Sequence, residues 1–126
     1  MDIISRMKPS LKPLFWVGSS KKDLMSLPTE VQDVFGYALH QAQIGGRHLQ
    51  AKTLQGFGSA GVIEVIENTR GATYRAVYTV KLANAVYVLH CFQKKSTQRI
   101  ATPKPDRDLI DERLKAAEAH AKGAKK

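Results

Sequence analysis

A group of cationic residues falls on and just after the most strand-like runs of the 126-residue sequence. Arg75 lies inside an apolar run, and Lys94 and Lys95 follow the next such run. An arginine on a rigid strand beside lysines at a strand end predicts an anion pocket. Such a pocket can hold a scissile phosphate and stabilise the charge of its transition state. From spacing alone, an ion pair or a solvated face is the more common role for Arg75, and a solvated loop is an equal alternative for the lysines.

One histidine, His90, falls within the last strand-like run. Strand alternation predicts that it shares a face with Val88 and Phe92, where a lone histidine is more often a satisfied core or edge residue than a general base. The neighbouring Cys91 is expected to be buried and inert. The sequence has no HExxH pair, P-loop, GxSxG motif or metal-like carboxylate cluster, so no metal or other cofactor is predicted.

The elements that must position these residues follow from the hydrophobic pattern. Residues 14–17 form a short apolar run that predicts a buried strand, and Ser19 and Ser20 can cap a short helix that ends near Leu27. Pro28 fits the first turn of a longer helix, which Gly45-Gly46 ends. The apolar stripe of that helix recurs at helical spacing at Val31, Val34, Phe35, Ala38, Leu39 and Ala42.

Three β-rich runs follow, at Val62–Glu67, Tyr74–Val80 and Ala85–Phe92. Their connections are too short for parallel crossovers, so they predict an antiparallel meander in which the third run is a central strand. After Pro103 and Pro105 a final helix is expected. Its apolar stripe consists of Leu109, Ile110, Leu114 and Ala117. The predicted order is β-α-α-β-β-β-α, an α+β fold with an antiparallel-rich sheet covered by helices.

Length and charge limit the class of protein. The length predicts a single domain over residues 1–126, with an irregular segment at 1–11 and a basic tail at about 116–126. Twenty Lys and Arg against eleven Asp and Glu give a net charge of +9, which favours nucleic acid, acidic membrane or an acidic protein as partner. One cysteine excludes an internal disulfide, and no run predicts a membrane span or signal peptide. We therefore expect a cytoplasmic protein.

Short motifs follow one another in a distinctive order between about residues 12 and 115. They are Leu54-Gln55-Gly56, a strand with Glu64, Tyr74-Arg75-x-Val77-Tyr78, Val86-Tyr87-Val88-Leu89-His90-x-Phe92-x-Lys94-Lys95, and Thr102-Pro103 before a helix. This order resembles the phage-derived HigB-like toxins of the RelE/ParE toxin–antitoxin superfamily. The resemblance implies a small cytoplasmic toxin that cleaves mRNA, in many members at the ribosomal A site. It also implies a helix-turn-helix antitoxin that neutralises the toxin and represses the shared operon.

The resemblance assigns roles to individual cations. Arg75 matches the strand arginine that holds the scissile phosphate, and Lys94 and Lys95 match the basic residues after the last core strand. Lys52 falls at a basic position common in this branch, and we assign RNA binding to it and to Arg99. In such sites the 2′-hydroxyl attacks the adjacent phosphate, and cationic side chains provide most of the electrostatic stabilisation.

The chain also departs from the best-studied RelE branch. The strand lysines of that branch fall here near Glu64 and Ile66, so their general base is absent. Glu64 and His90 are the remaining candidates for proton carriers. We expect a ribosome-dependent endoribonuclease without a metal, with mRNA, the ribosome and the antitoxin as partners. Two alternatives stay open: a ParE-type toxin that acts on DNA gyrase, and a non-catalytic phage protein that binds nucleic acid through its charge.

Overall fold

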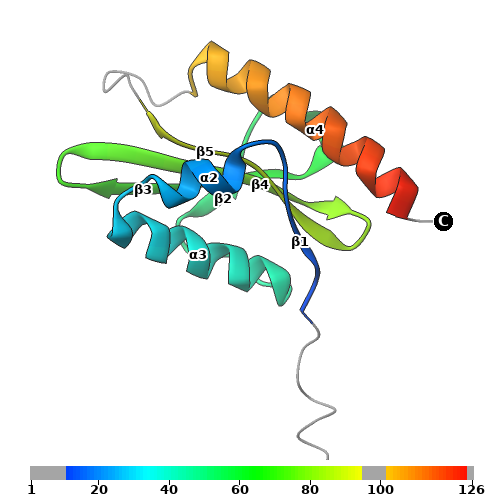
Figure 1. Ribbon diagram of the computed structural model, residues 1–126, viewed down its shortest axis with the longest axis horizontal. Coiled ribbons are helices and arrows are strands. Elements are labelled where there is room, and N and C mark those ends of the chain that lie inside the picture. Colours follow the sequence, from blue (N-terminus) through cyan, green and yellow to red (C-terminus); the bar gives the residue numbers. More distant parts are fainter. Residues whose placement is uncertain (1–10, 95–101, 125–126) are drawn as a thin grey trace, which may run out of the picture.

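A five-stranded sheet crosses the middle of the molecule (Figure 1). The structure is a computed structural model that describes residues 11–94 and 102–124. The strands are β1 (Leu14–Trp16), β2 (Ala51–Thr53), β3 (Val62–Thr69), β4 (Ala72–Leu82) and β5 (Ala85–Lys94). They lie in the order β1-β5-β4-β3-β2. The three predicted runs therefore form strands, each extending beyond its predicted end.

Helices cover both faces of this sheet (Figure 1). They are α2 (Ser20–Met25), α3 (Thr29–Gln43) and α4 (Lys104–Ala124), and a short 3-10 turn, η1, spans Gly58–Ala60. Buried side chains of α2 and α3 pack against one face, and those of α4 pack against the other. Two hydrophobic clusters thus enclose the sheet, and the predicted α+β fold is confirmed.

The strand pairing is antiparallel everywhere except at one edge. β3 pairs with β4 and β4 with β5 in an antiparallel meander, as predicted. β1 pairs parallel with β5, with Leu14 opposite Val86. Because β1 is an edge strand, its residues are only partly buried, whereas the sequence predicted a buried strand. β2 is a second short edge strand that the sequence pattern did not predict.

The periodic stripe of the long helix is confirmed in α3. Five of its six members are buried: Val31, Phe35, Ala38, Leu39 and Ala42. Pro28 is the N-cap residue of the helix, one position before Thr29. It therefore lies just before the first turn, in which it was predicted. The helix ends at Gln43, two residues before Gly45-Gly46.

A β-bulge in β5 changes which residues face α4. Val77 pairs with His90, but its neighbour Tyr78 pairs with Val88, so Leu89 is the extra residue. Leu89 packs in the cluster under α4, and His90 bonds to Asp106 of α4, while Val88 packs on the opposite face. The predicted shared face of His90 and Val88 is therefore wrong, because strict alternation does not survive a bulge.

The last helix is longer than its predicted stripe. α4 continues to Ala124, through most of the segment that the sequence marked as a basic tail. Ala117 and Ala121 are buried against the sheet, so this part of α4 packs as a helix on the sheet. Residues 125–126 lie outside the described residues. Within the described residues, no helix is both long and apolar enough to cross a bilayer.

Candidate functional site

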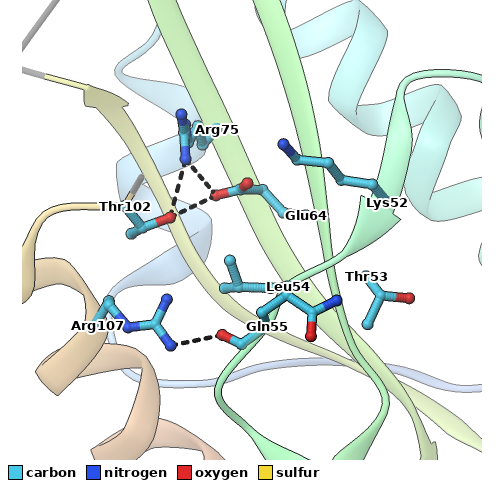
Figure 2. Close-up of a pocket in the computed structure, with 8 residues that line it drawn as sticks. All are labelled: Lys52, Thr53, Leu54, Gln55, Glu64, Arg75, Thr102 and Arg107. Atoms are coloured by element: carbon cyan, nitrogen blue, oxygen red, sulfur yellow. Dashed lines mark hydrogen bonds and ion pairs between the residues drawn. The ribbon is translucent and has the colours of Figure 1, made fainter. Parts of the chain in front are cut away.

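A cavity of about 360 Å³ opens on the α4 side of the sheet (Figure 2). Its walls come from β2 and the loop after it, from β3 and β4, and from the start of α4. The lining residues are Lys52, Thr53, Leu54, Gln55, Glu64, Arg75, Thr102 and Arg107. Three of the eight are cations and one is an anion, so the charge of the lining is mainly positive.

A buried hydrogen-bonded triad lies at one end of the cavity (Figure 2). Arg75 Nη1 donates to Glu64 Oε2 at 3.0 Å and to Thr102 Oγ1 at 2.9 Å. The Thr102 hydroxyl in turn donates to Glu64 Oε2 at 2.9 Å. The Arg75 and Glu64 side chains are 3% and 1% exposed. Ionic groups are stable at this depth only when paired, so the triad fixes the guanidinium in place.

Strand register explains why these side chains meet. Lys52 of β2 lies directly opposite Glu64 of β3. Arg75 of β4 lies opposite Ile66, which places it diagonal to Glu64 on the same face. Directly opposite and diagonal neighbours are within reach of long side chains. Three adjacent strands therefore align Lys52, Glu64 and Arg75 in one row under the N-terminal end of α4.

Arg107 closes the other end of the cavity. Its Nη2 donates to the carbonyl oxygen of Gln55 at 2.6 Å. Its guanidinium carbon lies 4.9 Å from the centroid of the Phe57 ring, a cation–π contact. Gly56 has a φ of +97°, and a Cβ there would collide with the Arg107 guanidinium. The loop after β2 can bind Arg107 this closely only because residue 56 is glycine.

The predicted lysines are divided between the described and undescribed parts of the chain. Lys94 ends β5 and is 6% exposed. It does not line the cavity, but burial and the charge of Arg75 lower its pKa, with Lys52 adding to this effect and Glu64 opposing it. Lys95 and Arg99 lie outside the described residues.

His90 lies apart from the cavity. Its Nε2 donates to Asp106 Oδ1 at 2.8 Å, and its ring stacks on Phe92 at 4.4 Å between centroids. Its Nδ1 is buried, with no hydrogen-bond partner within the described residues. Burial lowers the pKa of His90, against the opposing effect of Asp106. His90 thus joins β5 to α4, and of the two predicted proton carriers only Glu64 lines the cavity.

Comparison with known families identifies this chain. A model of the family described as "Phage derived protein Gp49-like (DUF891)" matches residues 22–115, well over half of the sequence. The chain belongs to this family. No curated protein and no solved structure matches it. All eight residues that line the cavity of this Gp49-like protein fall within the matched segment.

The buried histidine makes the stability of the Gp49-like protein depend on pH. Burial lowers the pKa of folded His90 below its ordinary 6.5, so the unfolded chain binds a proton first as the pH falls. The contribution of His90 to the free energy of unfolding should therefore fall as the pH drops through about 6.5 and level off below the folded pKa. His90→Gln keeps a donor for Asp106 but gains no proton. Urea titrations between about pH 7.5 and 5.5 should give a flatter profile for this variant, and equal slopes would contradict the prediction.

Several site residues of the Gp49-like protein were not predicted. Gln55 and Thr102 belong to the motifs of the resemblance, but no role was assigned to them, and Arg107 contributed only to the net charge of +9. The sequence did contain a signal for the ion pair of Glu64 and Arg75, because these opposite charges lie on adjacent predicted strands. Within residues 11–94 and 102–124, no cluster of His, Cys, Asp or Glu is able to hold a metal ion. Cys91 is buried as predicted, which raises its pKa to about 12.

Proposed function

We propose that this Gp49-like protein is the toxin of a type II toxin–antitoxin module and that it cleaves mRNA on the ribosome. The observation that carries the proposal is the convergence of Arg75, Lys52 and Arg107 on one cavity that also contains the Glu64 carboxylate. The resemblance to RelE-like toxins and the membership of a phage-derived family support it. The partner that follows is a cognate helix-turn-helix antitoxin, and the site of action is the cytoplasm, where ribosomes translate.

The cavity lining and Lys94 together supply the groups that this reaction requires. The 2′-hydroxyl attacks the adjacent phosphorus, and the bond to the 5′-oxygen of the next nucleotide breaks, leaving a 2′,3′-cyclic phosphate. Glu64 accepts the 2′-hydroxyl proton, because among the described residues it is the one carboxylate that lines the cavity. Arg75 and Lys52 stabilise the charge that develops on the phosphate oxygens. Lys94 delivers a proton to the leaving oxygen, for which its lowered pKa suits it.

The ion pair of the free protein fits this scheme as a resting state. Glu64 now occupies the position on Arg75 Nη1 that a phosphate oxygen would take. An incoming phosphate replaces the carboxylate as the partner of the guanidinium, which suits bidentate phosphate recognition. The displaced carboxylate is then available to accept a proton.

The depth of Arg75 supports a second candidate function. Its side chain is only 3% exposed and is already paired with Glu64, so a phosphate could instead bind only to the outer cations, without cleavage. The protein would then be a basic nucleic-acid-binding protein whose affinity falls steeply with salt.

The exposed Lys52 provides the cleanest test. Lys52→Gln removes one cavity charge with little effect on folding, and we expect mRNA cleavage to fall on the order of 100-fold. Induction of each variant in bacteria, followed by primer extension, maps new mRNA 5′ ends. Lys21→Gln is the matched control, because Lys21 is also exposed but lies in α2, which packs on the opposite face of the sheet.

Each outcome of this experiment separates the candidates. New ends at a fixed codon position that fade with Lys52→Gln and persist with Lys21→Gln support the ribonuclease. Growth arrest without new ends would contradict it and point to gyrase. The absence of both arrest and cleavage would leave the binding protein.

A further inference from the structure

We infer that the Arg107 end of the cavity is a stacking site for one unpaired base of a single-stranded RNA, adjacent to the phosphate site. The inference rests on the proposed function for its substrate class, and it goes beyond that function by assigning base recognition to Arg107, Phe57 and Leu54. None of these residues takes part in the proposed chemistry.

The first observation is that the Arg107 guanidinium is held as a fixed plane. The hydrogen bond to the Gln55 carbonyl anchors one nitrogen, and the Phe57 ring lies 4.9 Å from the guanidinium carbon. RNA-binding proteins stack unpaired bases on arginine planes and aromatic rings. A plane that is already immobilised loses little entropy when a base stacks on it.

The second observation is the change in character along the cavity. In Figure 2, Leu54 lies between Arg107 at one end and the triad of Arg75, Glu64 and Thr102 at the other. Leu54 is buried and contributes an apolar surface to the lining. A nucleotide has the matching pattern, since a flat and weakly polar base is joined to a charged phosphate. The base therefore lies over Leu54 against Arg107 when the phosphate lies at Arg75.

The third observation is size. Ligand pockets span roughly 300–1,000 Å³, and this cavity of about 360 Å³ is at the small end of that range. It accommodates about one nucleotide, not a duplex. A base within a duplex is stacked on both faces, so only a single strand presents a free base to this site.

Binding measurements with RNA that cannot be cleaved test the inference independently of catalysis. The probes are a fluorescein-labelled single-stranded RNA with 2′-O-methyl riboses and the same strand with abasic positions. Fluorescence anisotropy of the full chain should show about tenfold tighter binding of the base-bearing strand. Phe57→Leu, which keeps the packing but loses the ring, and Arg107→Lys, which keeps the charge but loses the plane, should remove this preference. Lys104→Ala is the matched control, because it removes an exposed cation from the same helix and should weaken both strands equally.

The outcomes distinguish this inference from the proposed function. Equal binding of the two strands by the wild-type protein would overturn the stacking site, even if mRNA cleavage is observed in cells. A preference for the base-bearing strand that Phe57→Leu and Arg107→Lys leave intact would also overturn it. A preference that both variants abolish supports the stacking site, even if no mRNA is cleaved. Failure to bind either strand would overturn the stacking site, whereas the proposed cleavage on the ribosome is decided by primer extension.

Discussion

Arg75→Ala is expected to lower the free energy of unfolding by about 3–5 kcal/mol. The substitution leaves the Glu64 carboxylate 1% exposed, with the Thr102 hydroxyl as its remaining partner in the triad. An uncompensated buried charge is costly because water cannot solvate it. Whole domains have only about 5–15 kcal/mol of stability, so urea denaturation should show a large fall in the midpoint.

A second arginine–glutamate pair provides the control for this measurement. Arg70 bonds to Glu30 at 3.3 Å, but the two side chains are 82% and 44% exposed. Arg70→Ala should therefore cost less than about 1 kcal/mol. Similar losses for the two variants would show that the Arg75 pair is not held in a dry environment.

The same triad allows stability and activity to be separated. Replacing a buried ionic group by apolar residues of similar volume is often neutral or stabilising. The combined variant Glu64→Met, Arg75→Met and Thr102→Val should therefore unfold near the wild-type midpoint, unlike Arg75→Ala. It has neither the guanidinium nor the carboxylate, so it should produce no mRNA cleavage. A folded triple variant that still cleaves mRNA would contradict the proposed site.

Ile110→Ala is expected to lower the free energy of unfolding by about 2–5 kcal/mol, and it is the second large effect. Ile110 is 0% exposed and belongs to the hydrophobic cluster that joins α4 to the sheet. The shortened side chain leaves a void between the sheet and α4, the helix that carries Arg107. Ile110→Val removes one methylene and should cost only about 0.5–1.5 kcal/mol in the same urea titration.

Hydrogen exchange gives a second readout of the Ile110 variant. Loosening of α4 should speed exchange of its backbone amides more than exchange in α3, which packs on the opposite face. A uniform increase in both helices would show instead that the two faces unfold as one unit.

Local patterns predicted the parts of the fold that depend on nearby residues. The α3 stripe from Val31 to Ala42 and the β3–β4–β5 meander follow from periodicity and short connections. The parallel pairing of β1 with β5 and the bulge at Leu89 were not predicted, because both depend on tertiary packing. The bulge alone was enough to assign His90 and Val88 wrongly to a shared face.

The candidate site was likewise only partly predictable from the sequence. The residue types predicted an anion pocket at Arg75, Lys94 and Lys95, and the family resemblance added Lys52. The structure brings Arg75 and Lys52 to one cavity, which Lys94 does not line. Thr102, just before α4, and Arg107, in its first turn, reach that cavity through contacts with residues 27 and 52 positions away. No local pattern encodes a contact over such a separation. Lys95 and Arg99 remain predictions, since they lie outside the described residues.

The pairing of β1 with β5 has a consequence for the order of folding during synthesis. The Ser20 hydroxyl bonds to the Val88 carbonyl 68 positions later, next to the strand pairing of Trp16 with Val88. Closing so long a loop is entropically costly, so local hairpins are expected to form before this edge is added. Chains grow at about 5–20 residues per second, and Thr102 and Arg107 emerge after every strand. A nascent chain that lacks Thr102 and Arg107 therefore has no complete cavity, and the cavity closes only after both residues have been translated.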